Sequence, residues 1–419
     1  MSSDWNDSVL SDVIDFNPKE ELKKGKTAKK IAMEELHPFD KKVNGFTLAE
    51  YSGGAKFRNG DTLLARITPC LENGKTAYVD ILEKDEIAFG STEFIVMRAK
   101  TGITDEAFIY YLATSPAFRA VAIQSMTGTS GRQRVQNNLL ENAVFRIPTL
   151  PEQRAIAATL SALDDKIELN NRINKTLEEM AQALFKQWFV DFEFPDENGQ
   201  PYKSSGGEME ESELGPIPKG WKLARLSDIC NVLSGGTPKT GVAEYWNGPI
   251  PFFSPKDASD GFYTIDTEKT ITGEGLKNCN SKLYPKDTVF ITARGTVGKV
   301  VLSGRDMAMN QSCYALQGRE EIGQYFLFFQ TVRAAEQLRK SASGAVFDAI
   351  IVKSFDSIKV VVPPTCFLES FCELVHSLLS NVCLNTEQNN YLSSLRDAIL
   401  PQLMSGEIRV PIEEVAADV

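Results

Sequence analysis

The chain has 419 residues, of which 42% are hydrophobic and 24% are charged. At roughly 150 residues per domain this length predicts two to three domains, and the composition excludes a disordered or collagen-like chain. No run approaches the ~18 apolar residues of a membrane span, and the N-terminus lacks the features of a signal peptide, so we expect a cytoplasmic protein. Seven cysteines without a Cys-x-x-Cys pair, and only two histidines, predict reduced thiols and no metal site.

The net charge of −11 at first opposes a nucleic-acid partner. The charge is unevenly distributed, however. Residues 1–150 carry 19 basic and 20 acidic side chains, and residues 222–362 carry 17 basic and 14 acidic ones. The excess acid therefore lies in the remaining segments, and the two long regions are compatible with DNA binding.

Residues 1–150 are predicted to form a first globular domain. The Asp61-Thr62-Leu63-Leu64 run followed by Gly74-Lys75 indicates a strand, a turn and a second strand. Basic and amide side chains on loops are the ones that contact DNA phosphates and base edges. The candidates are Arg66, Asn73 and Lys75 in the turn, and Arg132, Gln133 and Arg134 in the later loop that begins at Ser130. A merely solvated side chain is an equally good interpretation of each.

A long helix is predicted over residues 151–193, with Pro151 suited to its first turn. Its apolar side chains recur at alternating spacings of three and four residues, which is typical of a coiled-coil seam. The seam residues are Ile156, Leu160, Leu163, Ile167, Asn170, Asn174, Leu177, Ala181, Leu184 and Trp188. Residues 194–220, rich in Pro, Gly, Ser and Glu, are expected to form a connector loop.

Residues 221–363 are predicted to form a second domain that repeats the first. Trp5 and the run Leu10-Ser11-Asp12 recur as Trp221 and Leu226-Ser227-Asp228, a shift of 216 residues. The pattern of strand, turn and strand recurs between Asp287 and Lys299. Such a duplication predicts one fold used twice. Candidate DNA-contacting residues of this domain are Lys239, Lys256, Arg294 and Lys299, with the same alternative of a solvated charge.

A second long helix is predicted over residues 364–408, followed by an acidic tail over 409–419. Its seam repeats the first at a shift of 215 residues, so that Asn385 and Asn389 correspond to Asn170 and Asn174. Asparagine on an apolar seam is costly unless it meets another polar group, and antiparallel and parallel pairings would both match these residues. We favour antiparallel pairing, because two equivalent halves close most simply about a pseudo-two-fold axis.

The predicted fold class is therefore α/β (α+β), with two similar globular domains joined by two long antiparallel coiled-coil helices in a pseudo-two-fold internal repeat. Each seam corresponds to about 50 Å of helix at ~1.5 Å per residue. We expect the helices to act as a spacer with one domain at each end. The alternative is ordinary packing of a helical hairpin with no role in spacing.

Several segments resemble one protein family. The SELGPIPKGW run from Ser212 to Trp221, and the run from Leu400 to Ile408 after the second helix, are similar to signatures of the specificity subunit of type I restriction-modification systems. Pro151-Glu152-Gln153 and Ala183-Leu184-Phe185 resemble the family's central helical segment. The first domain begins Asp4-Trp5, without the Pro-x-Gly-Trp lead-in present at Trp221, which leaves the docking of the N-terminus open.

The resemblance implies a non-catalytic subunit with two target recognition domains, each of which binds one half of a bipartite, asymmetric site in double-stranded DNA. It also implies that the helices set the gap between the half-sites and dock two methyltransferase subunits, with or without restriction and translocase subunits. No cofactor would bind this chain, and the partner subunits would use S-adenosylmethionine, ATP and Mg²⁺.

Two other classes of function compete with this interpretation. A stand-alone DNA enzyme is opposed by the absence of a methyltransferase motif, since the only Pro-Pro pair is Pro363-Pro364, and by a phosphate-loop spacing that fails around Gly295. A metal site at His376, Cys372 and Cys383 would lack a fourth ligand. A helical scaffold that never touches DNA is opposed by the charge balance of the two domains.

Overall fold

The computed structural model describes residues 5–129, 131–319, 321–341 and 349–411. It divides into two compact units, residues 1–167 with 391–419 (unit 1) and residues 168–390 (unit 2). Each unit contains one globular domain and one segment of each long helix, α5 (Leu150–Phe189) and α10 (Thr365–Ser405). Asp4, Ser130 and residues 412–419 of the predicted tail lie outside the described residues.

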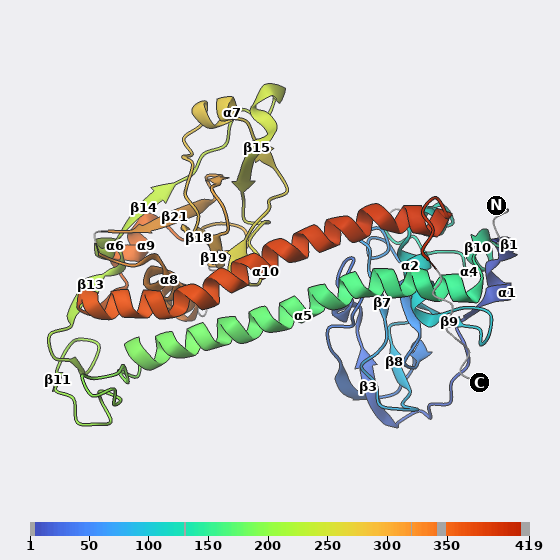
Figure 1. Ribbon diagram of the computed structural model, residues 1–419, viewed down its shortest axis with the longest axis horizontal. Coiled ribbons are helices and arrows are strands. Elements are labelled where there is room, and N and C mark those ends of the chain that lie inside the picture. Colours follow the sequence, from blue (N-terminus) through green and yellow to red (C-terminus); the bar gives the residue numbers. More distant parts are fainter. Residues whose placement is uncertain (1–4, 130, 320, 342–348, 412–419) are drawn as a thin grey trace. The chain divides into compact units, whose positions relative to one another are not determined.

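The globular part of unit 1 contains two four-stranded sheets with the strand orders β4-β3-β8-β5 and β2-β9-β6-β7, and a separate pair β1-β10. In Figure 1, β7 lies beside α5, whereas β3 and β8 lie farther from it. The strands are β1 (Asn6–Val9), β2 (Ile14–Phe16), β3 (Thr27–Ile31), β4 (Thr47–Glu50), β5 (Lys56–Phe57), β6 (Thr62–Ala65), β7 (Thr76–Tyr78), β8 (Ala88–Gly90), β9 (Phe94–Ala99) and β10 (Val144–Ile147). The helices are α1 (Leu10–Val13), η1 (Met33–Glu35), α2 (Glu106–Thr114), α3 (Pro116–Gln124) and α4 (Asn137–Glu141).

Strand β6 explains why the sequence around Leu63 is continuously apolar. Leu64 belongs to the buried cluster that contains Phe108 of α2, and Leu63 belongs to a different buried cluster that contains Ile31 of β3. The central sheet is therefore covered on both faces, which favours an unbroken apolar strand over an alternating one. Antiparallel pairing of β6 with β7 confirms the predicted strand, turn and strand.

The globular part of unit 2 repeats this topology. Its five-stranded sheet has the order β14-β21-β18-β19-β16, and the first four strands correspond one by one to β2-β9-β6-β7. The strands are β11 (Met209–Glu210), β12 (Ile217–Pro218), β13 (Lys222–Arg225), β14 (Cys230–Ser234), β15 (Trp246–Phe253), β16 (Tyr263–Thr264), β17 (Thr270–Ile271), β18 (Val289–Thr292), β19 (Val300–Ser303), β20 (Ala308–Met309), β21 (Cys313–Gly318) and β22 (Lys359–Val362). The helices are α6 (Leu226–Ile229), η2 (Ala243–Tyr245), α7 (Gly273–Lys277), α8 (Gln324–Ser341) and α9 (Val352–Asp356). The same order of strands in both units confirms the internal duplication.

Both long helices end close to their predicted limits, for identifiable reasons. Helix α10 ends at Ser405 because Gly406, at φ +75°, adopts the left-handed conformation that commonly terminates a helix. Helix α5 ends at Phe189, and the chain then turns at Phe192, which has φ +61°. The connector is less irregular than expected, because β11 pairs with β12 within it.

The four seam asparagines meet in unit 2 through direct amide contacts. The Nδ2 atom of Asn170 donates to Oδ1 of Asn389 at 2.8 Å, and Nδ2 of Asn385 donates to Oδ1 of Asn174 at 2.9 Å. The lower-numbered asparagine of α5 thus meets the higher-numbered one of α10, so the helices are antiparallel. Leu163 of the predicted seam is half-buried, as Ile167 and Leu177 are, and its neighbour Asp164, which the seam did not include, is buried.

Within the described residues, α10 is the one helix long and apolar enough, by length and composition, to cross a membrane. A core helix of a globular unit passes the same test. Phe371, Val375 and Leu379 of α10 are completely buried in the main apolar cluster of unit 2.

Candidate nucleic-acid interface

In unit 1 the structure brings the two predicted DNA-contact loops together. The turn between β6 and β7 and the loop that follows α3 are joined by a bridge between Ile67 and Arg134, and a bridge between Thr127 and Arg134 closes the second loop on itself. The backbone N–H of Thr68 also donates to the carbonyl of Gln133 at 3.0 Å. Two stretches more than sixty residues apart in the sequence therefore form one surface.

Three of the six candidates in unit 1 keep their polar groups accessible. Asn73 and Arg132 are exposed, and within the described residues their side chains have no hydrogen-bond partner. Arg134 is also exposed, and its guanidinium binds both carboxylate oxygens of Glu93, at 2.7 and 2.9 Å. This contact lowers the pKa of Glu93, so the pair stays ionised well below neutral pH.

The other candidates in unit 1 are tied to the domain. Lys75 Nζ donates to the carbonyl of Met33 at 2.8 Å, and Arg66 Nη2 donates to that of Val135 at 3.2 Å. Gln133 is half-buried and holds Thr68 through its carbonyl. The geometry of these three supports a role in shaping the loops.

Arg119 of α3 braces the same turn and is not apparent from the sequence. Its Nη2 donates to the carbonyls of Leu71 and Glu72 at 3.2 and 3.0 Å, and its guanidinium lies 4.7 Å from the ring centroid of Phe39. Burial lowers the pKa of this guanidinium, yet an arginine remains charged at any physiological pH. No local motif marks Arg119, because its partners Leu71, Glu72 and Phe39 all lie far earlier in the chain.

In unit 2 three loops meet in the same way. The backbone N–H groups of Ala293 and Arg294 donate to the carbonyl of Ser312 at 2.8 and 3.2 Å, and Thr296 Oγ1 donates to the carbonyl of Pro255 at 3.1 Å. The loops that carry Arg294, Ser312 and Lys256 are therefore adjacent. Thr237, two residues before Lys239, is hydrogen-bonded to Gln311 and links a fourth loop to this surface.

The candidates of unit 2 also divide into exposed side chains and a side chain that is paired within the domain. Lys239, Lys256 and Arg294 are exposed, and the side chain of Lys256 is 82% accessible, with only a long 3.9 Å contact to Glu268. Lys299 instead pairs with Asp260 at 2.7 Å and ties one loop to another. Gln311, exposed on the turn between β20 and β21, is a further candidate, because a glutamine amide can bind adenine with two hydrogen bonds.

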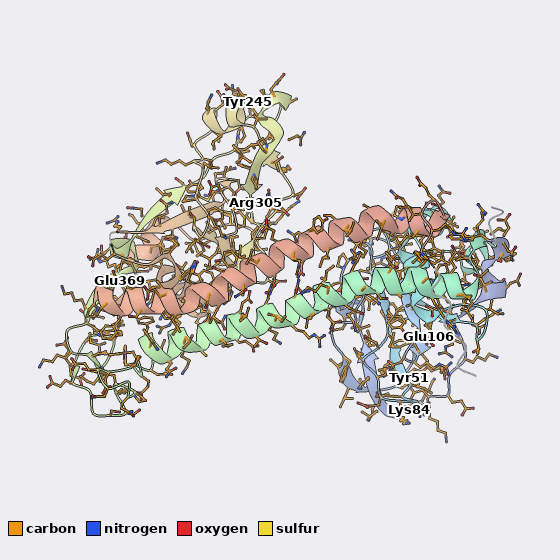
Figure 2. All side chains as sticks on the ribbon, in the orientation of Figure 1. Tyr51, Lys84, Glu106, Tyr245, Arg305 and Glu369 are labelled. Carbon is orange, nitrogen blue, oxygen red and sulfur yellow. The ribbon has the colours of Figure 1, made fainter. Side chains whose placement is uncertain are left out.

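Other charged side chains hold the second domain on its helices. Arg305, labelled in Figure 2, pairs with Asp266 at 2.6 Å, and Asp266 in turn accepts a hydrogen bond from Asn390 of α10. Glu178 of α5 accepts a hydrogen bond from the backbone of Phe262 at 2.8 Å, and its burial raises its pKa.

The residues of the possible metal site do not gather. His376 contacts Tyr325 at 3.1 Å and Ser380 at 3.4 Å, and Cys372 and Cys383 are free thiols. In the part of the chain that the structure describes, no three His, Cys, Asp or Glu side chains form a group able to hold a metal ion.

Replacing Arg119 should lower the free energy of unfolding of unit 1 and leave its exposed candidate side chains unchanged. Arg119→Met leaves two carbonyls without their donor, and we expect a loss of about 1–3 kcal/mol in the free energy of unfolding. Urea unfolding followed by circular dichroism measures it. The matched control is Arg132→Ala on the same surface, which should change stability by less than about 0.5 kcal/mol. Equal stability of the two variants would contradict the assigned role of Arg119.

Comparison with known proteins agrees with this architecture. A protein described as the type I restriction enzyme HindI specificity subunit of Haemophilus influenzae is 25% identical over 97% of this chain and 100% of its own length. The type I restriction enzyme MjaIX specificity subunit of Methanocaldococcus jannaschii is 28% identical over 74% of this chain and 71% of its own. The crystal structure of the type I restriction-modification S subunit from M. genitalium superposes with a TM-score of 0.57 at 16% identity, covering 96% of both chains, which shows a shared fold.

The family itself is identified by a match that covers most of the chain. Residues 2–179 and 218–366 each match the type I restriction modification DNA specificity domain, and the two matches coincide with the two halves of the internal repeat. The chain therefore belongs to the family of type I restriction-modification DNA specificity proteins.

Proposed function

We propose that this protein is the sequence-recognition subunit of a type I restriction-modification complex, in which each globular domain binds one half of a bipartite DNA site. The observation that carries the proposal is one fold used twice with different exposed side chains. The surface of unit 1 offers Asn73, Arg132 and Arg134, whereas that of unit 2 offers Lys239, Lys256 and Arg294. Because base readout depends on side-chain identity, the two half-sites should differ in sequence.

The loop surfaces suit a major-groove ligand. Exposed lysine and arginine contribute most of the affinity through the phosphates, and amide and guanidinium groups distinguish the bases. The loops carrying them are fixed by backbone hydrogen bonds, which limits the entropy lost on binding. The excess of acidic over basic residues lies outside the two domains, so it does not oppose this contact.

The helices support a second role as the docking site for two methyltransferase subunits. Large apolar side chains that remain exposed on the helices are Leu169, Ile173, Met180, Leu374, Leu384, Tyr391 and Leu395. Leu169, Ile173 and Met180 recur at spacings of four and seven residues, which places them on one face of α5, and an exposed apolar face commonly marks a protein interface. Methylation would be performed by these partners, which would flip the target adenine and supply S-adenosylmethionine, while ATP and Mg²⁺ would serve any restriction subunit.

In this proposal the chain itself is not catalytic, and it acts in the cytoplasm, where it meets DNA. The other candidate function is a helical scaffold that assembles enzymes without contacting DNA. The two are separated by the distribution of methylation in the genome, because a scaffold confers no sequence preference.

The direct test is co-expression of the chain with its methyltransferase subunit in a host that lacks DNA methylation, followed by single-molecule sequencing of the genome. We expect methylated adenines in a split motif with two different halves and a constant gap. The control is the same methyltransferase without this chain, which should leave the genome unmodified. Methylated adenines that share no split motif would refute sequence recognition by this chain.

The length of the helices should set the gap between the half-sites. Seven residues inserted after Arg172 and seven after Glu387 preserve the seam period and lengthen each helix by about 10 Å. At ~3.4 Å per base pair, the preferred gap should grow by about three base pairs, as read from the methylated sites. A matched seven-residue insertion after Gly199 in the connector should leave the gap unchanged, and an unaltered gap in the helix variant would refute the spacer role.

Base readout and phosphate contact should respond differently to substitution in unit 2. Gln311→Ala should relax the preference at one position of one half-site, with a loss of about 1–3 kcal/mol against the preferred base. Lys256→Ala should weaken binding to all sequences alike and reduce the salt dependence of affinity by about one phosphate contact. Fluorescence anisotropy of the complex on a panel of duplexes at several salt concentrations measures both. If Gln311→Ala weakened every duplex equally, Gln311 would not read a base.

A further inference from the structure

The internal repeat makes the helix pairing in the two units directly comparable. Helix α10 repeats α5 at a shift of 215 residues. The start of α5 against the end of α10 in unit 1 therefore corresponds to the start of α10 against the end of α5 in unit 2. At two positions related by the repeat, unit 1 carries charged side chains and unit 2 carries apolar ones.

The first place is occupied by a buried ion pair in unit 1. Arg396 of α10 binds Asp164 of α5 at 2.6 Å, with side chains 12% and 7% exposed. The other carboxylate oxygen of Asp164 accepts a hydrogen bond from Tyr111 at 2.6 Å, so the acid is fully paired.

The corresponding residues of unit 2 are apolar. Asp164 lies six residues before Asn170, and Arg396 lies seven residues after Asn389. Leu379 and Ala181 take the same places relative to Asn385 and Asn174. Both are completely buried in the main apolar cluster of the unit. In unit 2 the fold therefore packs this position with apolar side chains and has no ion pair there.

The second place shows the same contrast. In unit 1, Glu152 at the start of α5 is buried, accepts a hydrogen bond from Trp5 Nε1 at 2.9 Å and pairs with Arg409, which follows α10. The repeat-related residues in unit 2 are Phe367, Trp221 and Phe194. The rings of Phe194 and Phe367 are in direct contact, with centroids 4.6 Å apart.

The repeated fold does not itself demand these ion pairs, since unit 2 has apolar side chains at both places and burial of charge carries a desolvation cost. In each pair the acid belongs to α5 and the base belongs to α10 or the segment after it. We propose that the two pairs are a pairing code, through which α5 selects α10 and rejects the α5 of a second copy of this chain.

The asparagines cannot make this distinction. If a second α5 replaced α10 in the same register, Asn170 of one copy would meet Asn174 of the other, and the amides would still be matched. Asp164, however, would then meet Ala181, and Glu152 would meet Phe194. Two buried carboxylates would lose the arginines that pair with them, which is unfavourable. Pairing of α10 with α10 would likewise bury Arg396 against Leu379.

The code has a consequence that rests on the proposed function. Pairing of α5 with α10 combines two different recognition domains, whereas pairing of like helices would place two copies of the same domain on one DNA site. Such an assembly would read a palindrome in place of two different half-sites. The two ion pairs would thus preserve the asymmetry of the target.

The test is made in the full-length chain. It replaces the four residues of the two ion pairs in unit 1 by the residues that occupy the repeat-related positions of unit 2. The variant E152F/D164L/R396A/R409F and the natural chain are unfolded in urea and refolded at low and at high protein concentration. Size-exclusion chromatography with light scattering measures the dimer fraction. We expect the variant to show a several-fold larger, concentration-dependent dimer fraction.

The matched control reverses one pair. D164R/R396D keeps opposite charges between α5 and α10 and still penalises like pairing, so its dimer fraction should equal that of the natural chain. A dimer formed by swapping α5 onto the α10 of a second copy would keep both pairs, and its fraction would not respond to the four substitutions.

An unchanged dimer fraction in the four-residue variant would overturn the proposal. The double variant D164L/R396A gives the same comparison if the larger change impairs refolding. The measurement involves no DNA, so it separates failure of the pairing code from failure of DNA recognition.

Discussion

Asparagine side chains buried between two helices are tolerated only where each amide finds a partner. This constraint sets the register in which α5 pairs with α10. Asn170 and Asn174 of α5 meet Asn389 and Asn385 of α10, and a shift in register would leave these amides buried and unpaired. The apolar positions of the seam leave register weakly defined, because leucine packs against leucine in many alignments. Four amides therefore fix which residues of the two helices face one another.

The two globular domains repeat one topology but are joined to the helices by different chemistry. In unit 2, Phe185, Phe189 and Phe371 form an aromatic cluster, with rings 4.9 to 6.0 Å apart. In unit 1, the connection includes the buried Lys41, whose Nζ donates to Ser161 of α5 at 2.8 Å and whose pKa is lowered by burial. The duplicated fold therefore attaches to the helices through aromatic rings in one unit and through polar and charged groups in the other.

The recognition loops show how a rigid scaffold presents variable side chains. Backbone hydrogen bonds and inward-directed cations such as Lys75, Arg119 and Lys299 hold the loops in place. Exposed side chains such as Asn73 and Arg132 make no such contact within the described residues and can change with little effect on folding. This separation explains how one fold can serve two different half-sites within a single chain.

The sequence by itself determined the duplication, the two long helices, the connector and the match of the asparagines, because periodicity and repeats are local properties of a chain. The direction of pairing, the burial of Asp164, and the brace at Arg119 were decided only in the tertiary structure. Each depends on a partner remote in sequence: Asp164 is buried because Arg396 and Tyr111 satisfy its charge. The same holds for the loop surface, where the loops of Gln311 and Lys256 lie beside that of Arg294 through hydrogen bonds that no spacing of residue types encodes, from the backbone of Arg294 to Ser312 and from the Thr296 hydroxyl to Pro255.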